Sequence, residues 1–136
     1  MEIRFASSSL NEAFARTAVG AFLSQLDPTV EELYDIKMAV SEAVTNSIIH
    51  GYNAQADGEI VIKCSYEGKK IEIDVIDEGR GIPDVEKAMT ALYTTSIEEE
   101  RAGLGFSVMQ SMMDQVEVLS EVNKGTIIKL KKSLSA

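Results

Sequence analysis

The chain has 136 residues, 45% of them hydrophobic, which is enough for one domain with a buried core and too few for two such domains. Its formal net charge is −9, from 22 acidic and 13 basic side chains, so its surface would repel a phosphate backbone and direct nucleic-acid binding is not expected. The single cysteine, Cys64, excludes an intramolecular disulfide, and the lack of a long apolar run or signal peptide favours a cytoplasmic protein without a membrane segment.

The first elements predicted along the chain are a short strand over residues 2–5 and a helix that begins near Ser9. Ser9-Leu10-Asn11-Glu12 has the spacing of a capping box, in which a serine and a glutamate satisfy free N–H groups at a helix start. The 3.6-residue period then predicts one buried face, made of Leu10, Phe14, Ala18, Ala21 and Phe22.

The opposite face of this helix is predicted to carry Glu12 and Arg16 beside the aliphatic Val19 and Leu23. Charged side chains next to exposed aliphatic ones are typical of a protein-binding surface. A solvated face with an ion pair between Glu12 and Arg16 explains the same pattern equally well. The residues alone leave both interpretations open.

A second helix is predicted from Thr29, which starts another capping box, to about His50. Glu42, Asn46 and His50 are spaced four residues apart, so they lie on one face. An asparagine oxygen suits Mg²⁺, and a carboxylate one turn away can accept a proton from an attacking hydroxyl. This pattern makes Glu42 the candidate general base and Asn46 the candidate metal ligand. Without the glycine motifs described below, a solvated helix face would be the better interpretation.

Two β-hairpins are predicted beyond this helix. Apolar residues alternate over 60–66 and 71–75 around a turn at 67–70, and a second hairpin spans 115–131 around Asn123-Lys124-Gly125. Together with the helices they predict an α+β fold, a two-layer sandwich with helices on one face of a mixed, mainly antiparallel sheet. Residues 1–136 form a single domain in this interpretation.

Two glycine motifs mark the predicted ligand site. Asp77-Glu78-Gly79-Arg80-Gly81 follows a strand, and its glycines let a ligand approach the backbone closely. Gly103-Leu104-Gly105 precedes a helix predicted over 106–113, where free N–H groups attract phosphate. The weakly patterned segment around 84–103 is predicted to be a mobile lid over the ligand. A P-loop is absent from the sequence, so the nucleotide pocket must be of another type.

A Glu-x-x-x-Asn helix, an Asp-x-Gly-x-Gly strand end and a Gly-x-Gly pair together resemble the signature of the ATPase/kinase superfamily that includes gyrase, Hsp90, MutL and the histidine kinases. The finer resemblance is to the anti-sigma F family, the serine kinases of endospore-forming bacteria. It is carried by residues 25–29, 41–52, 77–84 and 121–126. The resemblance to the superfamily spans essentially the whole chain.

This resemblance implies a role for each candidate residue. Asp77 would recognise the adenine amino group of ATP or ADP, with Thr126 assisting through water. Asn46 would hold Mg²⁺ between the phosphates, Glu42 would be the base for a substrate serine, and Arg101 would neutralise charge on the γ-phosphate. The backbone would approach the nucleotide at four glycines, Gly79, Gly81, Gly103 and Gly105.

The resemblance also implies partners. Members of the family are homodimers that bind a sigma factor, here sigma F, and phosphorylate a serine of an anti-anti-sigma factor. The helix face with Glu12 and Arg16 matches the region that such proteins use for both partners. The alternatives are an anti-sigma kinase for a general-stress sigma factor and a non-catalytic ATP-sensing module. An autophosphorylating histidine kinase is disfavoured because the only histidine, His50, lies in the Glu/Asn helix.

Overall fold

The computed structural model describes residues 1–89 and 97–135, apart from the side chains of Lys87 and of residues 97–104. Five strands form one sheet in the spatial order β1-β2-β3-β5-β4. Their bounds are Glu2–Ala6 for β1, Glu59–Glu67 for β2, Lys70–Asp77 for β3, Gln115–Glu121 for β4 and Gly125–Ser133 for β5. All neighbouring strands pair antiparallel, so within the described residues the sheet has none of the parallel pairing that a mixed sheet would contain.

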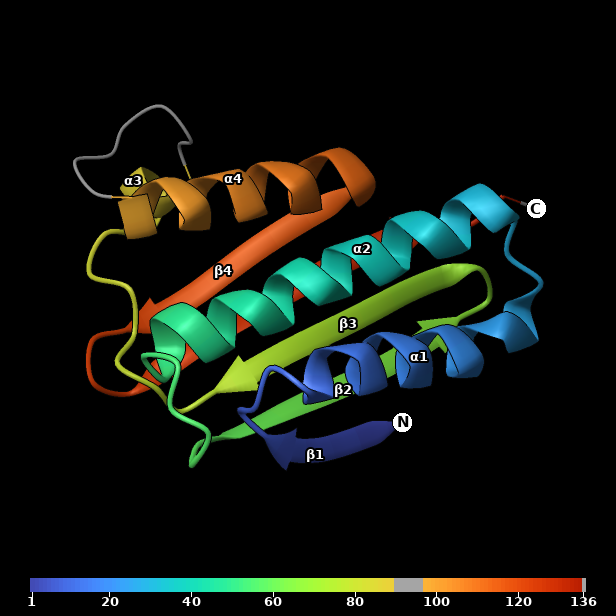
Figure 1. The fold of residues 1–136 in the computed structure, drawn as a ribbon. Coiled ribbons are helices and arrows are strands. Elements are labelled where there is room, and N and C mark those ends of the chain that lie inside the picture. Colours follow the sequence, from blue (N-terminus) through green and yellow to red (C-terminus); the bar gives the residue numbers. More distant parts are fainter. Residues whose placement is uncertain (90–96, 136) are drawn as a thin grey trace.

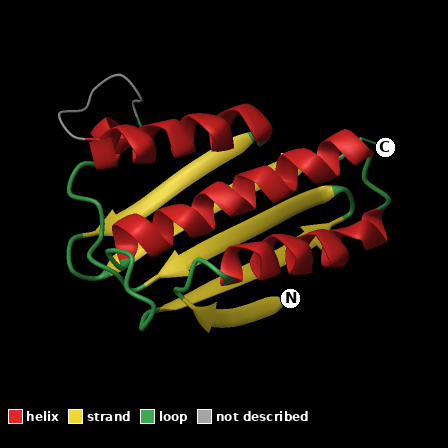
Figure 2. Ribbon diagram, in the orientation of Figure 1, coloured by secondary structure: helices red, strands yellow, loops and turns green. Residues whose placement is uncertain are grey.

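Helices cover one face of this sheet (Figure 1, Figure 2). The long helices are α1 (Asn11–Leu23), α2 (Val30–Asn46) and α4 (Ile97–Met112). Shorter helical segments are η1 (Ser24–Leu26), the π-helical η2 (Ser47–Gly51) and α3 (Val85–Ala88). The predicted two-layer α+β architecture is confirmed. Among the described residues, no helix is long and apolar enough to cross a membrane.

The hydrophobic core lies between the helices and the sheet. The strands β2 and β3 contribute alternate residues to it, namely Ile60, Ile62, Cys64, Ile71, Ile73 and Val75. This alternation confirms the first predicted hairpin, whose last pair joins Glu67 to Lys70 across a two-residue turn. The second predicted hairpin is present as β4 and β5.

The first helix begins later than predicted. Leu10 occupies the N-cap position without a side-chain hydrogen bond, so the predicted capping box at Ser9 is wrong. Instead, Ser8 Oγ accepts the N–H of Leu10 at 3.3 Å, and Asn11 Nδ2 donates to the carbonyl of Ala6 at 2.9 Å. These bonds hold the chain in a turn between β1 and α1, and Leu10 is 85% exposed rather than part of the core.

The face of α1 that enters the core also differs from the prediction. Val19 and Leu23, predicted to be exposed, are fully buried, whereas Phe14, predicted to be buried, is 49% exposed. This face of α1 packs against α2, where a Cβ on Gly20 would lie 3.2 Å from Lys37 Cε. The positions of the large apolar residues in the sequence therefore predict the wrong buried face.

The second helix starts as predicted. Thr29 Oγ1 accepts the N–H of Glu32 at 3.0 Å, and Glu32 Oε1 accepts the N–H of Thr29 at 2.9 Å, which forms the capping box. The α-helix ends at Asn46 and continues as η2, where the N–H of Tyr52 donates to the carbonyl of Ser47 at 3.0 Å. Such π-helical turns occur frequently at functional sites.

The helix α4 begins at Ile97, well before the predicted start at Phe106. Residues Glu98–Arg101 are strong helix formers. They extend the helix toward the N-terminus of the chain. Gly103 and Gly105 therefore lie inside the helix, and the prediction that they open it is wrong.

The predicted lid at 84–103 is only partly described. The helix α3 occupies its beginning and the first residues of α4 occupy its end. Residues 90–96 and the side-chain surroundings of Arg101 and Gly103 lie outside the described residues. The lid and the roles of Arg101 and Gly103 stay predictions.

Candidate active site

The last residue of β3, Asp77, lies against η2 at the end of α2 (Figure 1). Its side chain is only 4% exposed, and its Oδ1 accepts the N–H of Gly79 at 3.0 Å. Burial raises the pKa of Asp77, because an ionised carboxylate loses hydration there, and nearby N–H and hydroxyl groups oppose this increase only in part. A buried acceptor that faces few donors is suited to an amino group of a ligand.

Ser47 stands beside this carboxylate. Its hydroxyl is close enough to lower the pKa of Asp77, yet it forms no well-aligned hydrogen bond with any described residue. Ser47 is 1% exposed, so an unsatisfied hydroxyl there costs free energy unless a water or ligand pairs with it. Ser47 is a site residue that the sequence motifs did not reveal, although it directly follows Asn46.

Glycines let neighbouring backbone segments pack closely around Asp77. A Cβ on Gly79 would lie 2.2 Å from the carbonyl oxygen of Gly51, and a Cβ on Gly51 would lie 3.0 Å from the Asp77 carboxylate. At Gly125 φ is +121°, and a Cβ would lie 2.1 Å from the Asp77 carbonyl oxygen. Gly79 was predicted from its motif. The sequence indicates only a helix end at Gly51 and a turn at Gly125. It does not reveal their contacts with Asp77, because these contacts join distant parts of the chain.

The Asp-x-Gly-x-Gly loop is fastened to the β4–β5 hairpin. Gly81 has φ +74°, and a Cβ on it would lie 2.2 Å from the carbonyl oxygen of Glu121. The N–H of Ile82 donates to Ser120 Oγ at 2.7 Å, and Ser120 Oγ lies 2.7 Å from Thr126 Oγ1. Thr126 is 5% exposed and pairs with Asp77 across β3 and β5. The structure therefore brings the predicted residues Asp77, Gly81 and Thr126 together. Ser120, which was not predicted, connects the loop to Thr126.

The same loop is fastened to η2 on its other side. The N–H of Arg80 donates to the carbonyl of Gly51 at 2.9 Å, and Arg80 Nε donates to the carbonyl of His50 at 2.6 Å. The N–H of Glu78 donates to the Tyr52 hydroxyl at 2.7 Å. These bonds hold the Asp77 carboxylate at a fixed position relative to the end of α2.

The predicted base and metal ligand lie on α2. Asn46 is 7% exposed, and Glu42 one turn before it is half-buried. Burial raises the pKa of Glu42 above its ordinary value, and the carboxylate of Glu12 raises it further. A Cβ on Gly105 of α4 would lie 3.2 Å from Glu42 Oε2, so the glycine leaves room for this carboxylate. The structure brings Glu42 and Gly105 together.

The predicted partner residues lie where α1 contacts α2. Arg16 Nη1 donates to Glu12 Oε1 at 2.9 Å and to Ser41 Oγ at 3.2 Å, and the Ser41 hydroxyl also bonds to Glu12. The side chains of Arg16 and Glu12 remain 37% and 26% exposed. The predicted helix face was wrong, but both residues can still be reached by a partner, and they adjoin Glu42.

The polar side chains at the site are better suited to a nucleotide than to a metal ion bound by protein side chains alone. Among the described residues, no group of three histidine, cysteine, aspartate or glutamate side chains could hold a metal ion. A metal held here would need phosphate oxygens in addition to the amide of Asn46, as Mg²⁺ has in nucleotide sites. The Ser47 hydroxyl, which has no hydrogen-bond partner among the described residues, and the Asp77 carboxylate offer hydrogen-bonding groups to a polar base.

Comparison with known proteins identifies the family. Residues 6–132 match the model of the histidine kinase-like ATPase domain. The anti-sigma F factor of Thermoanaerobacter sp. (strain X514) is 59% identical over the whole chain and 94% of its own length, and that of Clostridium novyi (strain NT) is 54% identical over the whole chain and 95% of its length.

Two solved structures share the fold. The RsbU and RsbW domains of Rv1364c from Mycobacterium tuberculosis match with a TM-score of 0.73 and 20% identity, over the whole chain and 32% of that protein. The catalytic domain of histidine kinase ThkA matches with a TM-score of 0.63 and 16% identity, over the whole chain and 99% of that domain. Sequence motifs, fold and relatives agree: this chain belongs to the anti-sigma F family, built on a histidine kinase-like ATPase domain.

Proposed function

We propose that this chain is a cytoplasmic anti-sigma factor that binds and inhibits sigma F, and that it is also a kinase that uses ATP to phosphorylate a serine of an anti-anti-sigma factor. The observation that carries the kinase part is the placement of Glu42. A half-buried carboxylate stands one helical turn from the buried Asn46, on the helix whose end lies against Asp77. A protein that only senses ATP has no need of a base at that place.

In this proposal Asp77 accepts a hydrogen bond from the adenine amino group, and Thr126 assists through water. Asn46 is the residue that would hold Mg²⁺, which would neutralise phosphate charge when bound. Gly79, Gly81, Gly103 and Gly105 allow the backbone to approach the nucleotide.

Glu42 accepts the proton of the substrate serine as its Oγ attacks the γ-phosphorus. The new O–P bond forms while the bond between the γ-phosphorus and the oxygen bridging to the β-phosphate breaks, and ADP leaves with that electron pair. Arg101 is proposed to stabilise the charge on the transferred group. The raised pKa of Glu42 makes its carboxylate a stronger proton acceptor than an ordinary glutamate.

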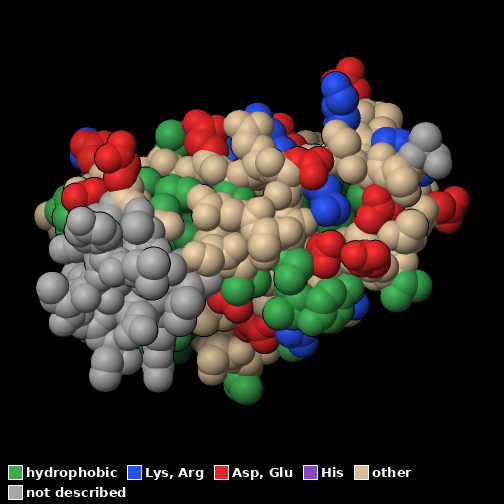
Figure 3. Space-filling model, turned by 90° about the horizontal axis from the view of Figure 1, so that it is seen from above, with side chains coloured by type: hydrophobic (Ala, Val, Ile, Leu, Met, Phe, Trp, Pro, Cys, Tyr) green, Lys and Arg blue, Asp and Glu red, His purple; other side chains and the backbone are tan. Residues whose placement is uncertain are grey.

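The proposed partners are sigma F, the anti-anti-sigma factor and a second copy of the chain. Glu12 and Arg16 are the proposed contact residues for the first two, because Arg16 is partly exposed and can pair bidentately with a partner carboxylate. On the face shown in Figure 3, acidic side chains are interspersed with basic ones. Such a surface, with a net charge of −9, favours protein partners over direct nucleic-acid contact.

Replacement of Glu42 tests the kinase proposal. Glu42→Gln keeps the size and helix propensity of the side chain but cannot accept a proton, so serine phosphorylation is expected to fall by about 10²–10⁴-fold. ATP affinity, measured by calorimetry, and sigma F binding are expected to stay at wild-type values. Glu31→Gln, an exposed position on the first turn of the same helix, is the matched control. Equal transfer rates in Glu42→Gln and wild type would remove Glu42 as the base.

A further inference from the structure

The hydroxyl of Ser41 on α2 takes part in the ion pair between Glu12 and Arg16 on α1. Ser41 Oγ donates to Glu12 and accepts a hydrogen bond from Arg16 Nη1 at 3.2 Å, while Arg16 Nη1 also donates to Glu12 Oε1 at 2.9 Å. Ser41 is 8% exposed, so this hydroxyl is buried between the helices. The three side chains, which we call the Ser41 cluster, thus close a ring of hydrogen bonds that joins α1 to α2.

The Ser41 cluster leaves one edge of the Arg16 guanidinium without a partner among the described residues. Both hydrogen bonds use Nη1, whereas Nε and Nη2 donate to none of the described groups. A guanidinium has five N–H donors in a fixed plane, and its Nε–Nη2 edge matches the two oxygens of a carboxylate. The side chain of Arg16 is 37% exposed, so such a carboxylate can come from a partner protein. It would share the positive charge of Arg16 with Glu12.

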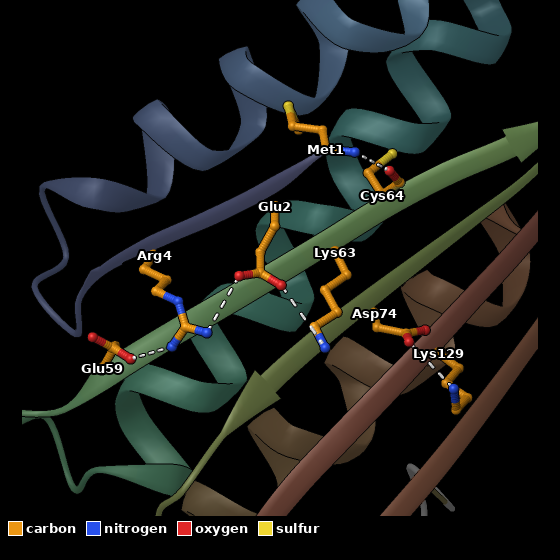
Figure 4. A network of polar contacts seen from close by, with 8 residues as sticks. All are labelled: Met1, Glu2, Arg4, Glu59, Lys63, Cys64, Asp74 and Lys129. Atoms are coloured by element: carbon orange, nitrogen blue, oxygen red, sulfur yellow. Dashed lines mark hydrogen bonds and ion pairs between the residues drawn. The ribbon is translucent and has the colours of Figure 1, made fainter.

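A second arginine, Arg4 on β1, shows a different arrangement. Arg4 donates from Nη1 to Glu59 at 3.1 Å and from Nη2 to Glu2 at 3.2 Å, so carboxylates of the chain itself take both terminal nitrogens (Figure 4). The side chains of Glu2 and Glu59 are 45% and 60% exposed. Arg16 is instead held by a buried hydroxyl and keeps Nη2 available, which suits recognition of an external carboxylate.

The Ser41 hydroxyl holds Arg16 more firmly than the ion pair alone would. An ion pair four residues apart on one helix is weak, and its long side chains keep much of their rotamer freedom. Ser41 adds one hydrogen bond to each of these side chains from the neighbouring helix. Side-chain freedom that is already lost in the free protein no longer opposes binding. Ser41 therefore prepares Arg16 for a partner.

The Ser41 cluster also adjoins the proposed base. Ser41 directly precedes Glu42 on α2. Burial raises the pKa of Glu42 and the Glu12 carboxylate raises it further, so Glu12 lies close enough to act on the charge of the base. A substrate that docks on Arg16 is thereby held near Glu42. Phosphoryl transfer depends on such placement of the attacking hydroxyl.

We propose that Ser41 is a positioning residue of the kinase: its hydroxyl fixes the Arg16 guanidinium with the Nε–Nη2 edge free to take a carboxylate of the anti-anti-sigma factor. In this role Ser41 acts through Arg16 rather than on the nucleotide or the substrate serine. The inference rests on the proposed kinase function, and it adds the residue that prepares substrate docking.

Steady-state kinetics of Ser41→Ala test this role. KM for the anti-anti-sigma factor is expected to rise by about 3- to 10-fold, because Arg16 then loses its freedom only on docking. The kcat value and KM for ATP are expected to change by less than about twofold, since the lost interaction contributes to binding alone. Ser41→Thr keeps the hydroxyl and is expected to keep the wild-type KM. Ser111→Ala, which removes an exposed hydroxyl of α4 that donates to the carbonyl of Val108, is the matched control.

A double-mutant cycle with Arg16 separates positioning from a structural role. If Ser41 acts through Arg16, Ser41→Ala raises KM in the wild-type chain but not in the Arg16→Ala chain. Looser packing of α1 on α2 would raise KM equally in both. Surface-binding kinetics of the anti-anti-sigma factor with ADP present give the same cycle without phosphate transfer. Ser41→Cys has nearly the same volume and only a weak donor, so it replaces Ser41→Ala if that variant unfolds.

The outcomes distinguish this inference from the proposed kinase. An unchanged KM in Ser41→Ala, or an equal rise of KM in the Arg16→Ala chain, would overturn the role of Ser41 and leave the kinase in place. A wild-type chain that transfers no phosphate to the anti-anti-sigma factor would overturn both.

Discussion

At the scale of single residues, burial of the Asp77 carboxylate lowers the stability of the protein at neutral pH. This carboxylate is 4% exposed, and burial raises its pKa. The folded state therefore binds the proton more tightly than the unfolded chain does. It follows that Asp77 lowers the free energy of unfolding as pH rises through the folded-state pKa, and has no such effect below the pKa of the unfolded chain.

Asp77→Asn is expected to stabilise the nucleotide-free protein by about 1 kcal/mol at pH 7, since the amide can still accept from Gly79 but carries no charge. The gain should be smaller at pH 4 than at pH 7, because the protonated fraction of wild-type Asp77 rises as the pH falls toward its raised pKa. Thermal unfolding at both pH values measures this difference. Equal stabilisation at the two pH values would show that charge burial is not the cause.

Adenine recognition by the same residue gives a separate prediction. Asp77→Ala removes the proposed acceptor of the adenine amino group and is expected to weaken ATP and ADP binding by about 1–3 kcal/mol. Asp57→Ala, in an exposed loop, is the matched control. Calorimetric titration decides the point, and unchanged affinity in Asp77→Ala would assign base recognition elsewhere.

At the scale of elements, α1 and α2 join the proposed partner surface to the proposed base. Arg16 donates to Glu12 and to Ser41, and Ser41 precedes Glu42 on α2. A partner carboxylate that takes Arg16 must compete with Glu12 for the guanidinium. The proposed partner residue Arg16 and the proposed base Glu42 are thus close in the structure, although they are distant in the sequence.

Arg16→Ala is expected to weaken binding of sigma F, the anti-anti-sigma factor or both, by about 1–2 kcal/mol or more, as arginine anchors do in interfaces. Because Arg16 is partly exposed, ATP affinity should stay unchanged and the free energy of unfolding should fall by no more than about 1 kcal/mol. Surface-binding kinetics with each purified partner measure the effect. Wild-type affinity for both partners would place the contact surface away from α1.

The segment between α3 and α4 carries the lid prediction. If residues around 84–103 close over phosphate, protease cleavage there should be slower with Mg-ATP than without nucleotide. Limited proteolysis followed by mass spectrometry locates the cuts. The same cleavage rate with and without Mg-ATP would mean that this segment does not respond to phosphate.

At the scale of the whole molecule, the sequence correctly predicts the helices and strands that are specified by neighbouring residues. The two hairpins follow from alternating apolar residues, and the start of α2 follows from the capping box at Thr29. Where packing between elements decides, the sequence fails. The buried face of α1 depends on how this helix packs against α2. The early start of α4 at Ile97 has a local signal instead, the strong helix formers at Glu98–Arg101, which the prediction overlooked.

In the candidate site too, residues in short local motifs were predicted and residues with long-range contacts were not. Asp77 and Gly79 are found from one short motif, and Glu42 and Asn46 from a four-residue spacing. Gly51, Gly125 and Ser120 are missed because each acts through a contact with a distant segment. These contacts exist only once the β3–β5 pairing has formed and the end of α2 has packed against β3.

We propose that one small domain both holds a sigma factor and responds to an anti-anti-sigma factor. The most direct test immobilises the full chain with Mg-ATP, adds purified sigma F, and then adds the unphosphorylated anti-anti-sigma factor. Saturable capture of sigma F is expected, followed by its release as the anti-anti-sigma factor binds. No capture of sigma F, or capture that the anti-anti-sigma factor leaves unchanged, would contradict it.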